Sequence, residues 1–182
     1  MACNITSGFT LGCRDNAGGI DEIYILSGSI TSITEPTEGL ATAITGSGKF
    51  YRFELPRNVG DFTEVPTPSN ENGTVFYDQT INVAFHKLQS SIRNQVKVLA
   101  QNPELTIIVK TNNGTADHVG EFFLAGRYRG LTLSAGTGGT GTAFGDANQY
   151  ALTFNGQEPL PFTEIQTNGN LSSALSGITV SS

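Results

Sequence analysis

The chain reads TVFYDQTINVAFHKLQSSIRNQVKVLAQNP from Thr74 to Pro103, and two different periodicities meet in this stretch. In its first part apolar side chains alternate with polar or small ones, as in a strand with one buried face. The alternating apolar residues are Ile81, Val83 and Phe85. From residue 87 to 101 the apolar spacing changes to four, four and three, which predicts an amphipathic helix that ends at Asn102-Pro103. The residues of this apolar stripe are Leu88, Ile92, Val96 and Leu99, and we expect Ile92 to lie in the core.

The composition around this unit favours strands and turns. The 182 residues include 22 Gly, and only 14% are charged, whereas a helical protein would need more Ala, Leu, Glu and Lys. We therefore expect a mainly β domain over residues 1–164, sandwich-like or barrel-like, with one flanking helix at about 87–101. The expected strands, besides the one before the helix, lie at 20–30, 40–44, 49–55, 105–110, 121–124, 130–134 and 149–154.

Two segments do not fit a core by their composition. Residues 56–73 contain three prolines and an Asn-Glu-Asn-Gly run, which predicts a long exposed loop. Residues 165–182 are rich in Ser, Asn and Gly, which predicts a polar C-terminal arm. We expect both segments, together with exposed strand edges, to mediate self-association. A further turn is expected at Gly46-Ser47-Gly48, between two strands.

Charge is unevenly distributed along the chain. The net charge is -6, and the acidic excess lies within residues 1–80. The expected helix instead carries three bases, Lys87, Arg93 and Lys97, which should face solvent or a partner. Tight DNA binding is disfavoured, because phosphate neutralisation needs clustered Lys and Arg. Neither a membrane span nor an export leader is expected, since no apolar run is long enough and the N-terminus lacks a basic region followed by an apolar stretch.

No motif predicts catalysis, a cofactor or a metal. The segment Gly136 to Gly141 matches G-x-G-x-x-G, but no helix follows it, so we interpret it as a mobile loop between strands. His86 and His118 have no ligand or nucleophile pattern around them, and Cys3 and Cys13 are expected to be reduced or inert. Asp21 and Glu22 should point to opposite faces of one strand, a poor geometry for shared acid–base chemistry. We expect no catalytic, cofactor-binding or metal-binding residues.

Three stretches, taken in order, resemble the tail tube proteins of tailed bacteriophages. They are Cys13 to Ile25, with a polar Gly-Gly turn before the first strand; Phe76 to Lys110, a strand–helix–strand unit; and Gly145 to Pro159, a last strand leading into Glu-Pro. The chain departs from the family at Thr115 to Gly120, where the hairpin tip looks extended.

The resemblance implies a structural subunit of a virion that is made in the host bacterial cytoplasm. Such subunits assemble into stacked hexameric rings, contact other tail proteins, and form a conduit through which viral DNA passes without specific binding. The expected channel lining is therefore neutral or negative, with the three helix bases facing elsewhere.

Two other classes of protein share these features. A capsid decoration or head–tail joining protein would have a similar small acidic β domain. A carbohydrate-binding or adhesion module would have similar strands and polar loops. The adhesion alternative is weakened by the absence of Trp and the aromatic content of 9%, because sugar-binding surfaces favour exposed aromatic rings.

Overall fold

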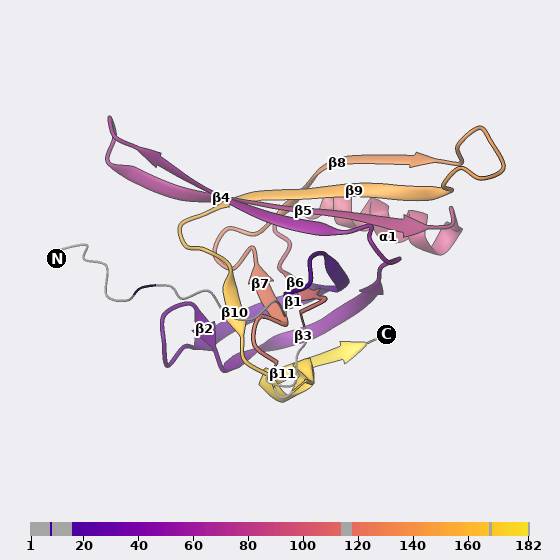
Figure 1. The fold of residues 1–182 in the computed structure, drawn as a ribbon. Coiled ribbons are helices and arrows are strands. Elements are labelled where there is room, and N and C mark those ends of the chain that lie inside the picture. The colour runs from indigo at the N-terminus through magenta and orange to yellow at the C-terminus, as the bar shows by residue number, and fades with distance from the viewer. Residues whose placement is uncertain (1–7, 9–15, 114–117, 168, 182) are drawn as a thin grey trace.

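The computed structural model describes residues 8, 16–113, 118–167 and 169–181, and it confirms a mainly β fold with one short helix (Figure 1). The elements are β1 (Ile20–Thr34), β2 (Leu40–Ala41), β3 (Ala43–Glu54), β4 (Asp61–Ser69), β5 (Thr74–His86), α1 (Ser90–Gln101), β6 (Ile107–Thr111), β7 (Phe122–Ala125), β8 (Thr132–Gly139), β9 (Gln149–Glu158), β10 (Thr163–Ile165), the 3-10 turn η1 (Leu171–Ala174) and β11 (Leu175–Ser181). Cys3, Cys13 and residues 115–117 of the predicted hairpin tip lie outside the described residues.

The strands form two sheets. A seven-stranded sheet, ordered β11-β3-β1-β6-β7-β10-β2, curls into a half-barrel, and a four-stranded sheet, ordered β4-β5-β9-β8, lies across it (Figure 1). Every pair in the four-stranded sheet is antiparallel. Helix α1 lies on the side of this smaller sheet that faces the half-barrel (Figure 1).

Two apolar clusters stabilise this arrangement. One fills the space between the sheets, and the other lies on the opposite face of the curled sheet. Strand β1 contributes to both, because Ile23 and Ile25 belong to the first cluster while Tyr24 and Leu26 belong to the second. This double burial explains why the sequence of β1 shows a continuous apolar run instead of alternation.

The predicted loop at 56–73 is wrong. Strand β4 occupies residues 61–69 and pairs with β5 along its whole length, from Asp61 opposite Asn82 to Ser69 opposite Thr74. Pro66 and Pro68 are tolerated because β4 is the outermost strand of its sheet, where a missing backbone donor need not break a ladder. The hairpin of β4 and β5 extends beyond the body of the molecule (Figure 1).

The predicted C-terminal arm at 165–182 is also wrong, because much of this segment is paired strand or buried turn. Strand β11 pairs in parallel with β3. Leu171, Ala174 and Ile178 are buried in the second apolar cluster. These apolar residues are few and separated by Ser, Gly and Thr, so the polar composition of the segment concealed its buried face.

The predicted turn at Gly46-Ser47-Gly48 is instead continuous strand within β3. Gly48 pairs with Gly28 of β1 and has a φ of +108°. A Cβ atom at Gly48 would lie 2.2 Å from the Ser27 carbonyl oxygen, so the close approach of β1 and β3 requires glycine here.

The helix is confirmed but begins later and is buried differently than expected. It starts at Ser90, because Lys87 adopts a φ of +70° and breaks the chain direction after β5. Leu99 is its buried residue, Ile92 is only half-buried against the first cluster, and Leu88 is exposed. The expectation that Ile92 lies in the core was therefore wrong, because Ile92 packs at the margin of the first apolar cluster.

Candidate functional site

The residues that the sequence singled out for chemistry do not converge. His86 is exposed at the end of β5, while His118 Nδ1 lies 2.9 Å from Glu121 Oε2 beside the β6–β7 hairpin. Within residues 16–113, 118–167 and 169–181, no group of three His, Cys, Asp or Glu side chains gathers as metal ligands. In the same ranges no helix is long and apolar enough to cross a membrane.

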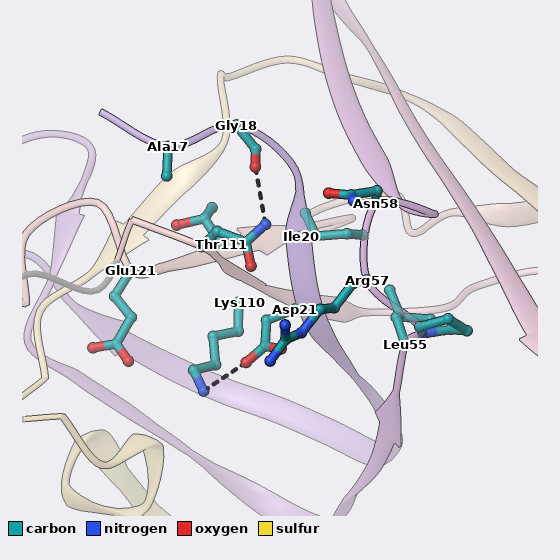
Figure 2. Close-up of a pocket in the computed structure, with 12 residues that line it drawn as sticks. Ala17, Gly18, Ile20, Asp21, Leu55, Arg57, Asn58, Lys110, Thr111 and Glu121 are labelled. Atoms are coloured by element: carbon teal, nitrogen blue, oxygen red, sulfur yellow. Dashed lines mark hydrogen bonds and ion pairs between the residues drawn. The ribbon is translucent and has the colours of Figure 1, made fainter. Parts of the chain in front are cut away.

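A cavity of about 590 Å³ lies between the start of β1, the end of β3 and the β6–β7 hairpin (Figure 2). Lys110 Nζ lies 3.1 Å from Asp21 Oδ2 and 4.0 Å from Glu22 Oε2. The expectation that these two carboxylates diverge is corrected, because a β-bulge between Ile20 and Glu22 shifts the register with β6. Thr111, whose hydroxyl donates to the Gly120 carbonyl, pairs with no general base in the described lining. The cavity therefore holds ion pairs that join β1 to β6.

The glycine-rich motif has a packing explanation. Gly136 and Gly138 belong to β8 and lie opposite Leu152 and Tyr150 of β9. A Cβ atom at Gly138 would lie 2.6 Å from Tyr150 Cε1, so the ring occupies the space that the glycine leaves. The prediction of a loop here was wrong for residues 136–139; the connection between the two strands runs from 140 to 148.

A candidate functional surface is the outward side of the four-stranded sheet, which we call the polar face. Its side chains alternate with the buried Ile81, Val83 and Phe154, so they point away from the core. They are short and polar, and they form cross-strand hydrogen bonds: Thr153 Oγ1 donates to Asn82 Oδ1 (2.9 Å), and Asn155 Nδ2 donates to Thr80 Oγ1 (2.9 Å). The polar members of this face are Asp61, Thr63, Asp78, Thr80, Asn82, Thr132, Thr153, Asn155 and Gln157, and the exposed Val65, opposite Asp78, lies on the same side.

The charged side chains of this sheet, apart from His86, are all acidic. Strands β4, β5, β8 and β9 contain no Lys or Arg. Of their four acids, Glu64 and Glu158 turn inward and accept backbone N–H groups, which leaves Asp61 and Asp78 on the polar face. The polar face is therefore weakly negative.

The three helix bases lie elsewhere. Helix α1 packs on the core side of the four-stranded sheet through Ile92, Val96 and Leu99. Lys87, just before the helix, and Arg93 and Lys97 within it are exposed, as expected. The helix lies on the core side of the four-stranded sheet, and the polar face is the other side of that sheet (Figure 1).

Within the part of the chain that the structure describes, both edges of the four-stranded sheet are open. Among the described residues, β4 pairs only with β5 and β8 pairs only with β9. The proline-free half of β4, Asp61 to Val65, retains all its backbone donors, and β8 consists mostly of small residues that allow a close approach. Unpaired N–H and C=O groups on such edges are templates for a further strand.

Buried polar residues that the sequence reading missed fix the far end of this sheet. Glu158 is 1% exposed and accepts backbone N–H groups from Tyr128 (3.0 Å), Arg129 (2.8 Å) and Gly130 (3.1 Å). Gln79 is also buried, and its Oε1 accepts from Gly126 N at 3.0 Å. The only sequence signal for these two buried residues was the position of Glu158 and Gln79 in strands, on the same side as apolar residues.

Comparisons of the chain with protein-family models, with curated proteins and with solved structures give no match.

Proposed function

We propose that this chain is the structural subunit of a phage tail tube, a virion component that assembles into stacked rings around a channel for the genome. The observation that carries the proposal is the four-stranded sheet: a polar face without Lys or Arg lies between two open strand edges. A protein that lines a conduit with a continuous sheet needs these two properties together.

The directions of the strands allow neighbouring copies to pair edge to edge in a ring. The four strands alternate in direction, so β8 of one copy and β4 of a rotated copy are antiparallel and can pair. This is a heterologous contact, which closes into a ring when the rotation fits. With the six copies that the family resemblance implies, 24 strands spaced about 4.8 Å and tilted about 40° give a circumference of about 150 Å, or a diameter of about 48 Å. A barrel of that width would hold an open channel.

Charge complementarity supports the same contact. Residues 58–86, which include the protruding β4–β5 hairpin, contain four acids and no Lys or Arg, whereas 87–101 contain three Lys or Arg residues and no acid. Helix α1 packs near β8, so in the ring the acidic hairpin of one copy comes close to the basic surface of its neighbour. Opposite charges on the two sides of one repeated contact favour a single register.

The weak negative charge of the polar face suits a path for DNA. Lys and Arg in the lining would add phosphate affinity at every ring, and the summed attraction would retard the genome. In this arrangement the polar face lines the channel, and Lys87, Arg93 and Lys97 contact a neighbouring copy or solvent.

Electron microscopy of the purified full chain at high concentration tests the proposal. Hollow tubes of constant width are the expected result. Isolated rings would favour a head–tail joining protein, and monomers at every concentration would favour a decoration or adhesion module.

A single substitution tests the role of the β4 edge. Deleting residues 57–72 would remove β4 and the core contact of Phe62, so it would confuse folding with assembly. Val65→Lys instead places a charge on the exposed edge strand, where Lys blocks pairing. Val65 is 55% exposed, and Val119, at 65% in the turn that precedes β7, gives an exposed Val→Lys control away from the four-stranded sheet.

We expect Val65→Lys to fold normally but to stay monomeric in sedimentation velocity, while Val119→Lys assembles like the wild type. Normal assembly of Val65→Lys would contradict pairing through β4.

A further inference from the structure

The connection between β8 and β9 presents a single apolar side chain to solvent. Phe144 is fully exposed, and no other large apolar side chain of the described residues is as exposed. An isolated exposed residue needs no explanation by itself. Phe144 differs from an ordinary exposed residue because hydrogen bonds hold the turn around it in one conformation.

The turn is held in one conformation by Asp146. Its Oδ2 accepts the backbone N–H groups of Thr142 and Ala143, both at 2.7 Å, and its own N–H donates to the Ala143 carbonyl at 3.1 Å. The backbone at position 144 is therefore fixed before any partner arrives. A preordered anchor binds more tightly than a mobile one because less conformational freedom is lost on binding.

A cavity of suitable chemistry lies at the opposite end of the same sheet. It measures about 210 Å³, and its apolar lining comes from Leu160, Pro161 and Phe162. An apolar cavity of about 150 Å³ already accepts a benzene molecule. Arg127 and Glu35 of the lining are paired with each other at 2.5 Å, so neither presents an unpaired charge to an incoming ring, while the exposed Glu38 adds one carboxylate to the lining.

This cavity is also preordered. Gln79 Nε2 donates to the Leu160 carbonyl at 3.4 Å, and Glu64 Oε2 accepts the Phe162 N–H at 2.6 Å. Both side chains come from the four-stranded sheet, so the wall of the cavity is fixed to the strands that the proposed channel uses.

Phe144 and the cavity are separated by the length of one strand. Phe144 precedes Gln149, the first residue of β9, and Leu160 follows Glu158, the last. Ten residues of strand span about 33 Å, so a second copy displaced along the strand direction brings its Phe144 to this cavity. We propose that Phe144 of one copy inserts into the cavity at Leu160 to Phe162 of the next copy, as the axial contact between rings. This inference rests on the proposed tube function, and its partner is a second copy of this chain.

A second apolar cavity does not fit the same translation. It is lined by Phe53, Phe85, His86 and Ile92, among others, and His86 pairs with Gln149. That cavity therefore lies at the same end of the sheet as Phe144, where a copy displaced along the strands presents its opposite end.

Photo-crosslinking locates the contact directly. The full chain is made with p-benzoylphenylalanine at position 144, assembled, irradiated and digested. We expect crosslinks between copies that map to residues 159–163. Crosslinks to the cavity at Phe53 and Phe85, or none between copies in assembled tubes, would overturn the axial contact while leaving the tube function standing. Failure of the wild type to assemble would overturn both.

Substitution gives the energetic test. Phe144→Ala should raise the critical concentration for tube elongation at least about tenfold, as expected for removal of a central aromatic anchor. Tyr51→Ala, which removes another exposed aromatic ring on β3, is the matched control and should change it less than about twofold. An unchanged critical concentration for Phe144→Ala would overturn the proposal. Equal thermal midpoints of both variants and the wild type exclude a folding defect as the cause.

Discussion

Glu158 shows how one buried carboxylate organises the end of the four-stranded sheet. It is the acceptor for three consecutive backbone N–H groups, from Tyr128 to Gly130, in a place that water hardly reaches. Glu158→Ala would leave these donors without a partner, and each buried unsatisfied donor costs about 1–3 kcal/mol. We expect a loss of at least about 3 kcal/mol in the free energy of unfolding, measured by urea titration.

The control for this variant is Glu71→Ala at the exposed hairpin turn, which should change the same free energy by less than about 0.5 kcal/mol. A loss of under about 1 kcal/mol for Glu158→Ala would mean that the three N–H groups find other partners.

Asp146 gives the turn that presents Phe144 a dependence on pH. The backbone N–H groups of Ala143 and Thr142 hold the pKa of this carboxyl below its ordinary value of 3.8. Because the pKa is lowered in the folded state, the ordering of the turn is complete above about pH 4 and is lost as the pH falls through the folded-state pKa. Carboxyl NMR titration should give a midpoint below 3.8, with the Thr142 and Ala143 amide shifts following it. A midpoint at or above 3.8 would contradict the capping role.

Residue identity alone could not show what these positions do. The G-x-G-x-x-G letters suggested a loop, whereas two of these glycines make room for Leu152 and Tyr150 across the strand pair. Cross-strand neighbours are set by register, which single-sequence periodicity does not contain. Glu158 was noticed only as part of a Glu-Pro segment, because its three donors lie about 30 residues earlier in the chain.

At the scale of an element, Ala substitutions in and just before helix α1 test which of its apolar side chains are buried. Leu99 is buried, Ile92 is half-buried and Leu88 is exposed. Leu99→Ala should therefore cost about 2–5 kcal/mol, Ile92→Ala about 1–2 kcal/mol and Leu88→Ala less than about 1 kcal/mol. Urea titration of the three variants gives the order. A larger cost for Ile92→Ala than for Leu99→Ala would show that the helix is rotated relative to this description.

Elements with a clear period were predictable, and those without one were not. The alternation in β5 and the stripe in α1 were identified because each has one buried face. Strand β4 was missed because its prolines signal a loop, although an edge strand tolerates them. Strand β11 was missed because its Ser, Gly and Thr residues outnumber its apolar ones. The sequence of an edge strand reports local propensity, while its pairing depends on a partner far along the chain.

At the scale of the whole molecule, the separation of acidic from basic side chains predicts that an assembled tube does not bind DNA. The polar face holds two acids and no base, and the helix bases lie across the sheet from it. Mobility-shift assays on preassembled tubes at about 50 mM salt should detect no duplex binding, although low salt strengthens electrostatic attraction. Tight binding that weakens steeply with salt would indicate a nucleic-acid-binding surface and reject a neutral conduit.

The uneven distribution of charge could be predicted from the sequence, but the polar face could not. Most of the acids in residues 1–80 lie outside the polar face, for example Asp21 and Glu22 beside Lys110. The polar face itself consists mostly of Thr and Asn side chains, which in the sequence look like ordinary solvent-facing positions. Only the topology, which brings β4, β5, β9 and β8 together, shows that these positions form one surface with an open edge on each side.

The structure of the assembled wall is the most direct test of the central claim. Cryo-electron microscopy of tubes grown from the purified chain should show β8 of each copy paired with β4 of its neighbour, and a channel lined by Thr80, Asn82, Thr153 and Asn155. Tubes whose channel is lined by Lys87, Arg93 and Lys97, or a chain that forms no tubes at any concentration, would contradict the account.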